Sequence, residues 1–411
     1  MKKLLGLTLG IMTALGGFVD LGQIVFTTQA GSLFGYQLVW AIGLGTAAII
    51  DYMEMCGRVA VVAHEPVFAV VRDRLGKRLG LATLIASNLL NLLTCAAELG
   101  GMAIVIHLLT GWNERLVLIG ITLILIAFLF LCRFQWMERV FGLSGLLMVV
   151  FAVSAVVLHP DWGNVVRGFV PGLHAADSRR GLLYAYFGVG IFSAMLMEYE
   201  VHFYSSGVIE EDWKPKDLGE NFIVALLGSV LGSLLTVGLL ILGALIFLPS
   251  RVFPDLLSTA IWAGAFPFGQ KALVLALFGA LACIGGAAVE TALSGGYNAC
   301  QFYDLPWGKN LPFRSAPIFT AIWIGTFAVA ALIIFAGLRP LQLINFSIVF
   351  GMAVMPFTYY PILRVAADKN IMGKHVNTRL ETAVGIVFLV LITLAAIAAF
   401  PLMILTHAGR P

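Results

Sequence analysis

Charged residues are scarce in this chain of 411 residues: only 11% are Asp, Glu, Lys or Arg, whereas 60% are hydrophobic. The mean hydropathy is +0.97. Soluble domains carry about 25% charged residues, so the composition excludes an ordinary soluble protein and indicates an integral membrane protein. The net charge is +3. Its cations are spread over short connections and form no basic face, which argues against a nucleic-acid partner.

Cysteine frameworks and common catalytic motifs are also missing. The five cysteines lie in apolar segments without C-x-x-C spacing, so we expect buried small side chains rather than disulfides or zinc ligands. The sequence contains no H-E-x-x-H, G-x-S-x-G or P-loop pattern. We therefore expect neither an enzyme nor a bound cofactor.

Long apolar runs fill the chain. A helix needs about 20 apolar residues to cross the hydrocarbon core, and windows of that length predict about 11 transmembrane helices in a single domain, 1–411. Each half opens with a helix interrupted by polar residues, a weak trace of a repeat that would divide the chain into 1–158, 182–365 and an additional helix, 381–406. The predicted spans are 5–30, 35–62, 79–109, 114–132, 139–158, 182–209, 219–249, 270–301, 315–337, 341–365 and 381–406.

Loop charges predict the orientation. Lys and Arg are enriched in alternate connections, beginning with the segment 72–78, and this bias places the N-terminus in the cytoplasm. A signal peptide is the alternative for the first run, with Lys2 and Lys3 as its basic start. The length of that run and Asp20 within it favour a first membrane helix. We expect a multi-pass protein in the bilayer of the plasma (inner) membrane.

Acidic residues interrupt two of the predicted spans. The run 187–209 carries Glu198, Glu200 and His202, and the run 7–30 carries Asp20. An ionisable side chain at membrane depth costs several kcal/mol unless it faces a cavity, a partner or a bound ion. Two interrupted helices with carboxylates in corresponding places predict a cation site near the bilayer midplane.

The residues around Asp20 suit an opened helix. Gly16, Gly17 and Gly22 flank the carboxylate, and Gln23 follows three residues later. An unwound turn frees backbone carbonyls that can coordinate a cation, while Asp20 adds a full charge and Gln23 a neutral oxygen. The alternative is a kinked helix in which Asp20 pairs with a distant arginine.

The second interrupted span offers a different donor set. Glu198 and Glu200 cannot face the same way on a regular helix, so we expect one at the site and the other at a partner. Met197 supplies a thioether, a soft ligand that selects transition metals; packing in the core is the alternative role of such a methionine.

Further ionisable residues lie in other spans. Glu98 and Glu290 are candidates for ion or proton relays, or for pairing with an arginine or a backbone group. Glu54 and Arg58 have the i,i+4 spacing of a helical ion pair, and we expect this pair to be structural.

Several short motifs resemble those of the Nramp family of metal-ion transporters, and the resemblance covers nearly the whole chain. It rests on Asp20-Leu21-Gly22-Gln23 with Gln29-Ala30-Gly31, Glu54-Met55-Cys56-Gly57-Arg58, Met197-Glu198-Tyr199 with Ser205-Ser206, Pro356-Phe357, and Asp368-Lys369-Asn370-Ile371-Met372-Gly373. The resemblance implies an all-α membrane protein of LeuT-like fold, with two inverted five-helix repeats plus one helix.

The resemblance also implies a set of metal ligands. The carried-over ligands are the side chains of Asp20, Gln23 and Met197 and the backbone carbonyls of Gly17 and Ala194. Residues that could extend the site or line the pathway are Glu198, Tyr199, Glu200, Glu98 and Glu290.

This chain departs from the family pattern in ways that bear on mechanism. Gln23 stands where the family has Asn, and Leu21 and Glu198 replace the two motif prolines. Groups associated with proton movement are replaced by Tyr199, Tyr204 and Cys95, so we expect weak or no proton coupling. The sequence around Glu200 and Glu290 is similar to that of the Nramp-related branch that includes magnesium transporters. That branch normally lacks a methionine at the position of Met197.

These observations lead us to expect a transporter of divalent metal cations, Mn²⁺ and Mg²⁺ with Fe²⁺ as a further candidate, that works by alternating access. Oxygen ligands favour hard ions such as Mg²⁺, whereas Met197 favours Mn²⁺ or Fe²⁺. An organic-cation carrier of the same fold and a non-transporting metal sensor are the two competing hypotheses. The sequence names no protein partner.

Overall fold

The computed structural model describes residues 19–172 and 178–410, and every regular element in those ranges is a helix. Ten helical spans among them are long and apolar enough to cross a membrane. The first predicted span is described only from residue 19, so most of it lies outside the described residues. The ten spans are Val39–Ala63 (α3), Val67–Thr110 (α4), Glu114–Leu131 (α5), Phe134–Val157 (α6 to α7), Ser178–Glu210 (α9 and α10), Pro215–Ser250 (η4 to α12), Gln270–Phe302 (α14), Pro317–Phe335 (α15), Pro340–Ala366 (α16) and Arg379–Leu405 (α18).

Three of these spans change helix type or break along their length. The pieces are α6 (Phe134–Gly145), η3 (Leu146–Met148) and α7 (Val149–Val157); α9 (Ser178–Ala194) and α10 (Glu198–Glu210); and η4 (Pro215–Asp217), α11 (Leu218–Leu242), η5 (Gly243–Phe247) and α12 (Leu248–Ser250). The remaining short elements are η2 (Gln23–Thr27), α2 (Thr28–Phe34), α8 (Trp162–Arg167), α13 (Leu257–Ala265), α17 (Lys369–Met372) and η6 (Gly373–His375).

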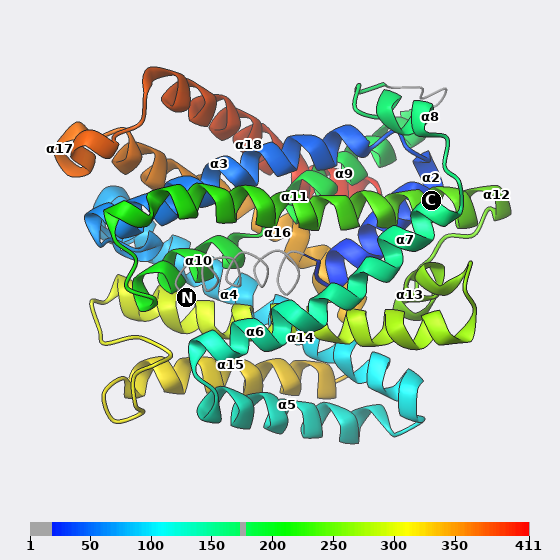
Figure 1. The fold of residues 1–411 in the computed structure, drawn as a ribbon, viewed down its shortest axis with the longest axis horizontal. Coiled ribbons are helices and arrows are strands. Elements are labelled where there is room, and N and C mark those ends of the chain that lie inside the picture. The colour runs from blue at the N-terminus through cyan, green and yellow to red at the C-terminus, as the bar shows by residue number, and fades with distance from the viewer. Residues whose placement is uncertain (1–18, 173–177, 411) are drawn as a thin grey trace.

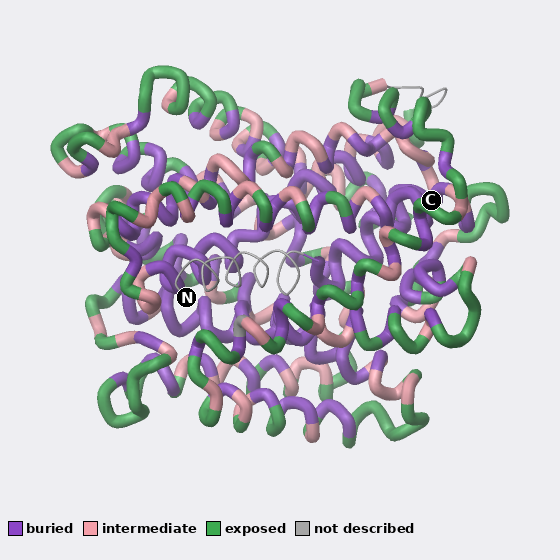
Figure 2. The backbone as a smooth tube through the Cα atoms, in the orientation of Figure 1, coloured by how far each residue is buried: buried purple, intermediate pink, exposed green. Residues whose placement is uncertain are grey.

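The long helices run side by side along the longest axis of the molecule (Figure 1). α5 and α15 form one flank, α18 lies on the opposite flank, and α4 packs against α14, α15 and α16 between them. The flanking helices carry most of the exposed positions, whereas the middle of the bundle is buried (Figure 2). Exposed side chains on these flanks include Leu123, Leu332 and Ile397. Apolar faces of this extent are uncommon on soluble monomers and suit contact with lipid.

The third span is longer than the predicted 79–109. α4 begins at Val67, directly after Pro66, and its direction changes at Gly76, which has φ 75° and ψ 168°. Proline is well tolerated where a helix begins, and glycine adopts positive φ at little cost. The basic segment 72–78 therefore lies on helical residues rather than in the predicted connection.

The predicted pair of Glu54 and Arg58 is confirmed, and it is part of a larger junction. Arg58 Nη2 lies 2.8 Å from Glu54 Oε2 and also donates to Asn377 Oδ1 at 2.7 Å, while Nη1 donates to the His375 carbonyl at 2.8 Å. Asn221 Nδ2 on α11 donates to the Glu54 carbonyl at 3.0 Å. This junction fixes α3 to α11 and to the segment that follows η6.

We expect Arg58→Gln to destabilise the protein by about 3 kcal/mol, because it leaves Glu54 without its cation in a largely buried junction. The measurement is thermal unfolding of the purified protein in detergent. Arg72→Gln is the matched control, because Arg72 forms an exposed pair with Asp73 that contributes at most about 1 kcal/mol. Equal stability of the two variants would contradict the structural role of Arg58.

Candidate functional site

Asp20 lies immediately before the described helical part of the first span. Its side chain is fully buried, and its Oδ1 accepts a hydrogen bond from the Gln23 backbone N–H at 2.8 Å. The next backbone N–H, that of Leu21, donates to both carboxylate oxygens of Glu98 on α4 at 3.3 Å. Among the described residues, Asp20 Oδ2 has no hydrogen-bond partner. The helix backbone thus anchors one carboxylate oxygen of Asp20.

The second break separates α9, which ends at Ala194, from α10, which begins at Glu198. Met197 has the extended ψ of 111° at this break, so its neighbours do not complete the helical hydrogen-bond ladder. Its side chain is 9% exposed and packs with Tyr199 and Ala287. Tyr199 is also within hydrogen-bonding reach of the Asp20 carboxylate. Met197 and Asp20 therefore both lie next to Tyr199.

The two breaks meet through Gln23. Its Nε2 donates to the Ala194 carbonyl at 2.9 Å, and Thr236 Oγ1 on α11 donates to its Oε1 at 3.3 Å. This network orients the amide so that nitrogen rather than oxygen faces Ala194. Two predicted ligands, Gln23 and the Ala194 carbonyl, are thereby brought into contact with each other. A cation bound by Gln23 and by the Ala194 carbonyl would replace this hydrogen bond. The Gln23 amide would then have to rotate so that its oxygen faces the ion.

The last of the predicted ligands, the carbonyl of Gly17, lies outside the described residues. The competing interpretation of the first break, an ion pair between Asp20 and a distant arginine, finds no support within residues 19–172 and 178–410, because Asp20 takes part in none of the ion pairs there. No three His, Cys, Asp or Glu side chains of the described ranges converge as a metal cluster. A cation here would be held by one carboxylate together with neutral donors.

Glu98, Glu200 and Glu290 surround the first break with further acidic charge. All three are at least 99% buried. Asp20 lies close enough to interact electrostatically with Glu98 and with Glu200, and Glu200 interacts with Glu290 on α14. In the described part of the chain, Glu200 Oε1 and both oxygens of Glu290 have no hydrogen-bond partner. The region is therefore rich in negative charge, as a site for a cation requires.

Glu198 and Glu200 have different neighbours. Glu200 lies toward Asp20 and Glu290, whereas Glu198 Oε1 accepts a hydrogen bond from Ser87 Oγ on α4 at 2.5 Å. His202 Nε2 is 3.5 Å from the same oxygen of Glu198. Glu198 therefore faces α4, away from the acidic group around Asp20.

Sequence reasoning missed a polar stripe on α4. Ser87, Asn91, Thr94 and Glu98 are each at most 2% exposed, and their spacing of four, three and four residues places them on one face of the helix. The stripe is about 16 Å long and bonds to Leu21 at one end and to Glu198 at the other. This periodicity was visible in the sequence as small polar residues that recur in an apolar span.

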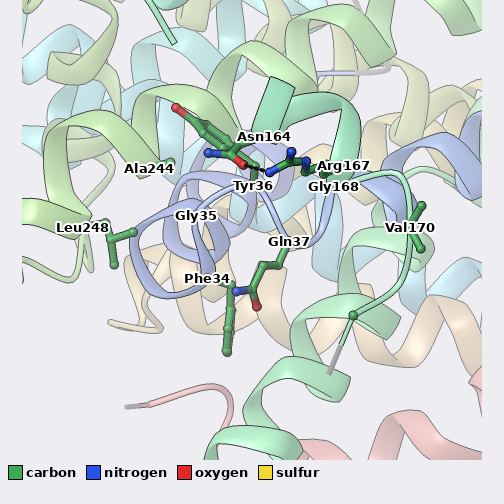
Figure 3. A pocket seen from close by; sticks show the side chains of 11 residues that line it. Phe34, Gly35, Tyr36, Gln37, Asn164, Arg167, Gly168, Val170, Ala244 and Leu248 are labelled. Atoms are coloured by element: carbon green, nitrogen blue, oxygen red, sulfur yellow. Dashed lines mark hydrogen bonds between the residues drawn. The ribbon is translucent and has the colours of Figure 1, made fainter. Parts of the chain in front are cut away.

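A separate cavity of about 510 Å³ opens at one end of the bundle (Figure 3). The turn after α2, the helix α8, Ala244 of η5 and Leu248 of α12 line it, and Arg167 donates to Asn164 within it at 3.4 Å. None of the described residues that line it is acidic. A cavity with an arginine and no carboxylate among these residues is not suited to a metal cation, and we place the candidate cation site at the helix breaks instead.

Solved structures with the same arrangement of helices are transporters. The manganese transporter of Eremococcus coleocola superposes with a TM-score of 0.75 at 20% identity, covering 96% of this chain and 86% of that one. MhsT in complex with L-phenylalanine gives a TM-score of 0.59 at 14% identity, covering 99% and 98% of the two chains. Mhp1, a nucleobase-cation-symport-1 family transporter, gives 0.58 at 16% identity, covering 98% and 92%. The fold is therefore LeuT-like, as predicted.

Sequence relatives agree with this likeness. The chain is 25% identical over 389 residues to divalent metal cation transporter MntH 1 of Pseudomonas aeruginosa, covering 90% of this chain and 85% of the relative. It is 25% identical over 393 residues to MntH of Bacillus subtilis, covering 91% and 87%. The model of the family described as natural resistance-associated macrophage protein-like matches residues 10–400. The chain therefore belongs to the Nramp family.

Proposed function

We propose that this protein transports divalent metal cations across the plasma membrane by alternating access. The ion would be held by the side chains of Asp20, Gln23 and Met197 and by the backbone carbonyls of Gly17 and Ala194. The observation that carries the proposal is Oδ2 of the fully buried Asp20, which has no hydrogen-bond partner among the described residues and lies near the bond from Gln23 to the Ala194 carbonyl. Relatives named divalent metal cation transporters support it.

Mn²⁺ is the ion that best fits these donors, with Mg²⁺ second and Fe²⁺ a further candidate. The oxygens of Asp20 and the backbone suit hard cations, while the Met197 thioether favours a transition metal over Mg²⁺. The buried carboxylates Glu98, Glu200 and Glu290 add negative charge around the site, which lowers the cost of bringing a dication into a low-dielectric region.

Alternating access would follow from the two breaks. The break between α9 and α10 joins helical segments that can move separately, and the contacts of Gln23 with Ala194 and Thr236 are hydrogen bonds that an ion can replace. Proton coupling would be weak or absent, because Tyr199, Tyr204 and Cys95 stand at positions where the family has groups associated with proton movement.

An organic-cation carrier of the same fold is the competing hypothesis. The cavity that Met197 lines measures about 10 Å³, room for about one water molecule, and a polyamine would not fit there in this conformation. A metal sensor without transport activity is distinguished only by experiment, because it would share the same donors.

The experiment that tests the proposal is uptake of Mn²⁺ into proteoliposomes containing the full-length protein, with Mg²⁺ or spermidine as competitor and a pH-sensitive dye inside. We expect saturable Mn²⁺ uptake that Mg²⁺ inhibits, no inhibition by spermidine, and no acidification that follows the metal. Metal binding without uptake would indicate a sensor, inhibition by spermidine would favour the organic-cation carrier, and proton flux that rises with metal uptake would contradict weak coupling.

We expect Met197→Ala to weaken Mn²⁺ uptake about tenfold while Mg²⁺ uptake changes little, because the thioether is a ligand that Mg²⁺ does not prefer. The measurement is the ratio of the two half-saturating concentrations. Met372→Ala is the control, since Met372 is also buried but lies in α17 at one end of the bundle. A parallel loss of both ions in Met197→Ala would assign Met197 to packing instead.

A further inference from the structure

The short helix α8 is fixed to the bundle on one side and carries exposed apolar side chains on the other. The Trp40 N–H donates to the Gly168 carbonyl at 2.8 Å, and a Cβ on Gly168 would lie 2.1 Å from the Tyr36 carbonyl oxygen. α8 and the turn after it thus lie tightly against the turn after α2. Four of their apolar side chains are at least 52% exposed: Trp162, Val166, Phe169 and Val170.

The position of α8 suits contact with lipid. The long helices run along the longest axis of the molecule, and α8 lies at one end of the bundle near its edge (Figure 1). Apolar side chains presented there reach the boundary between headgroups and acyl chains, the level at which Trp is enriched in membrane proteins. The exposed side of α8 is therefore a surface for lipid.

The cavity of about 510 Å³ opens beside this helix, and its volume is in the range of sites that take small organic groups. Asn164 and Arg167 of α8 line it together with Tyr36 from the turn after α2. Figure 3 shows the Arg167 side chain next to those of Tyr36 and Asn164. Leu248 of α12, which is 39% exposed, adds an apolar wall. The cavity thus combines one cation with polar and apolar surface.

The charge around the cavity favours an anion. Within residues 19–172 and 178–410, the exposed Arg167 donates only to Asn164, at 3.4 Å. The guanidinium of Arg180 lies 6.0 Å from the ring centre of Phe34, which lines the cavity. Asp161 is the acid at the start of α8, and Asn164 donates to both of its oxygens, at 3.1 and 2.7 Å. Two arginines and one hydrogen-bonded acid leave this end of the bundle positively charged.

From these observations we propose that the cavity binds the headgroup of an anionic phospholipid. Arg167 pairs with the phosphate through charge-assisted hydrogen bonds, and Arg180 adds a second positive charge beside the same wall. The acyl chains lie along the exposed side chains of α8, such as Trp162 and Val166. A soluble phosphate would use the arginines but would leave these apolar side chains uncovered. The proposal needs no metal ion and is independent of the proposed function.

The test is the affinity of the purified full-length protein in detergent for phosphatidylglycerol and phosphatidylcholine, measured by native mass spectrometry. We expect one phosphatidylglycerol per chain to be held more tightly than phosphatidylcholine. Arg167→Gln should lower the affinity for phosphatidylglycerol about fivefold, the loss that one basic residue at an anionic lipid surface brings. The double variant with Arg180→Gln should bind both lipids equally. Both arginines are exposed, so these variants should fold.

Arg115→Gln is the matched control. Arg115 is exposed on α5 and lies 5.4 Å from the ring centre of Phe335, an aromatic contact like that of Arg180 but away from the cavity. This variant should keep the preference of the wild type. Equal affinity of the wild type for the two lipids, or an unchanged preference in the double variant, would overturn the proposal.

A second comparison separates a lipid from a soluble anion. Val166 is 66% exposed, so Val166→Asn should fold normally and yet bind phosphatidylglycerol more weakly, because it removes apolar surface from the path of the acyl chains. Glycerol phosphate, which has the charged group without the chains, should fail to displace the lipid at an equal concentration. Displacement by glycerol phosphate, with no effect of Val166→Asn, would make the ligand a soluble anion and contradict the lipid site.

Discussion

Asp20→Asn is expected to lower the affinity for Mn²⁺ by at least about 100-fold and to abolish uptake. Altering groups that merely support a metal ligand costs 10–100-fold in affinity, and this change removes the charge of the ligand itself. Asparagine keeps the size of the side chain and its Oδ1, so the hydrogen bond from the Gln23 N–H can persist and the break can keep its shape. The measurement is Mn²⁺ binding by isothermal titration calorimetry, followed by uptake.

Asp51→Asn is the matched control for this result. Asp51 lies on α3 and accepts a hydrogen bond from the Tyr359 hydroxyl at 2.6 Å, outside the proposed ligand set. We expect its variant to bind and transport Mn²⁺ as the wild type does. Retained affinity in a well-folded Asp20→Asn protein would remove Asp20 from the site.

Gly31→Ala is expected to cost about 3 kcal/mol of stability. α2 and η5 touch backbone to backbone at Gly31 and Gly243: a Cβ on Gly31 would lie 2.2 Å from the Leu240 carbonyl oxygen, and one on Gly243 would lie 2.3 Å from that of Thr28. These neighbouring atoms belong to the backbone, so they cannot move to make room for a Cβ as the end of a flexible side chain can. The measurement is the midpoint of thermal unfolding in detergent, and Gly243→Ala should show a similar loss.

Gly120→Ala, by contrast, is expected to leave the stability of the protein unchanged or to raise it slightly. Gly120 lies inside α5, and nothing lies within 4 Å of a Cβ added there. Alanine in a helix interior is favoured over glycine by about 0.5–1 kcal/mol, so this variant should unfold at the same temperature or slightly higher. If Gly31→Ala and Gly120→Ala unfolded at the same temperature, the close approach of α2 and η5 would not contribute to stability.

The helix breaks were predictable because their signals are local. Glycines beside Asp20 and two acids beside Met197 conflict with a regular membrane helix, and the structure shows non-helical backbone at residues 19 and 20 and again between Ala194 and Glu198. The spans followed from apolar length alone. The start of α4 at Val67 was missed, because basic residues indicated a connection where the chain continues as a helix to Gly76.

The contacts of the predicted site residues could not be derived from the sequence. Gln23 was predicted as an oxygen donor, but its partners, Ala194 and Thr236, are 171 and 213 residues away, and only the packed bundle orients the amide. The direction of Glu198 depends in the same way on Ser87 of α4. The sequence-based prediction focused on ionisable residues, so it missed Thr236 and Ser87, the small polar side chains that form these contacts.

The most direct test of the proposed metal site is a crystal structure of the protein soaked in Mn²⁺, with anomalous data collected at the manganese absorption edge. We predict a peak in direct contact with Asp20, between it and Met197, that disappears in Asp20→Asn crystals. A peak elsewhere with an empty space between Asp20 and Met197, in protein that takes up Mn²⁺, would contradict the assignment of the site.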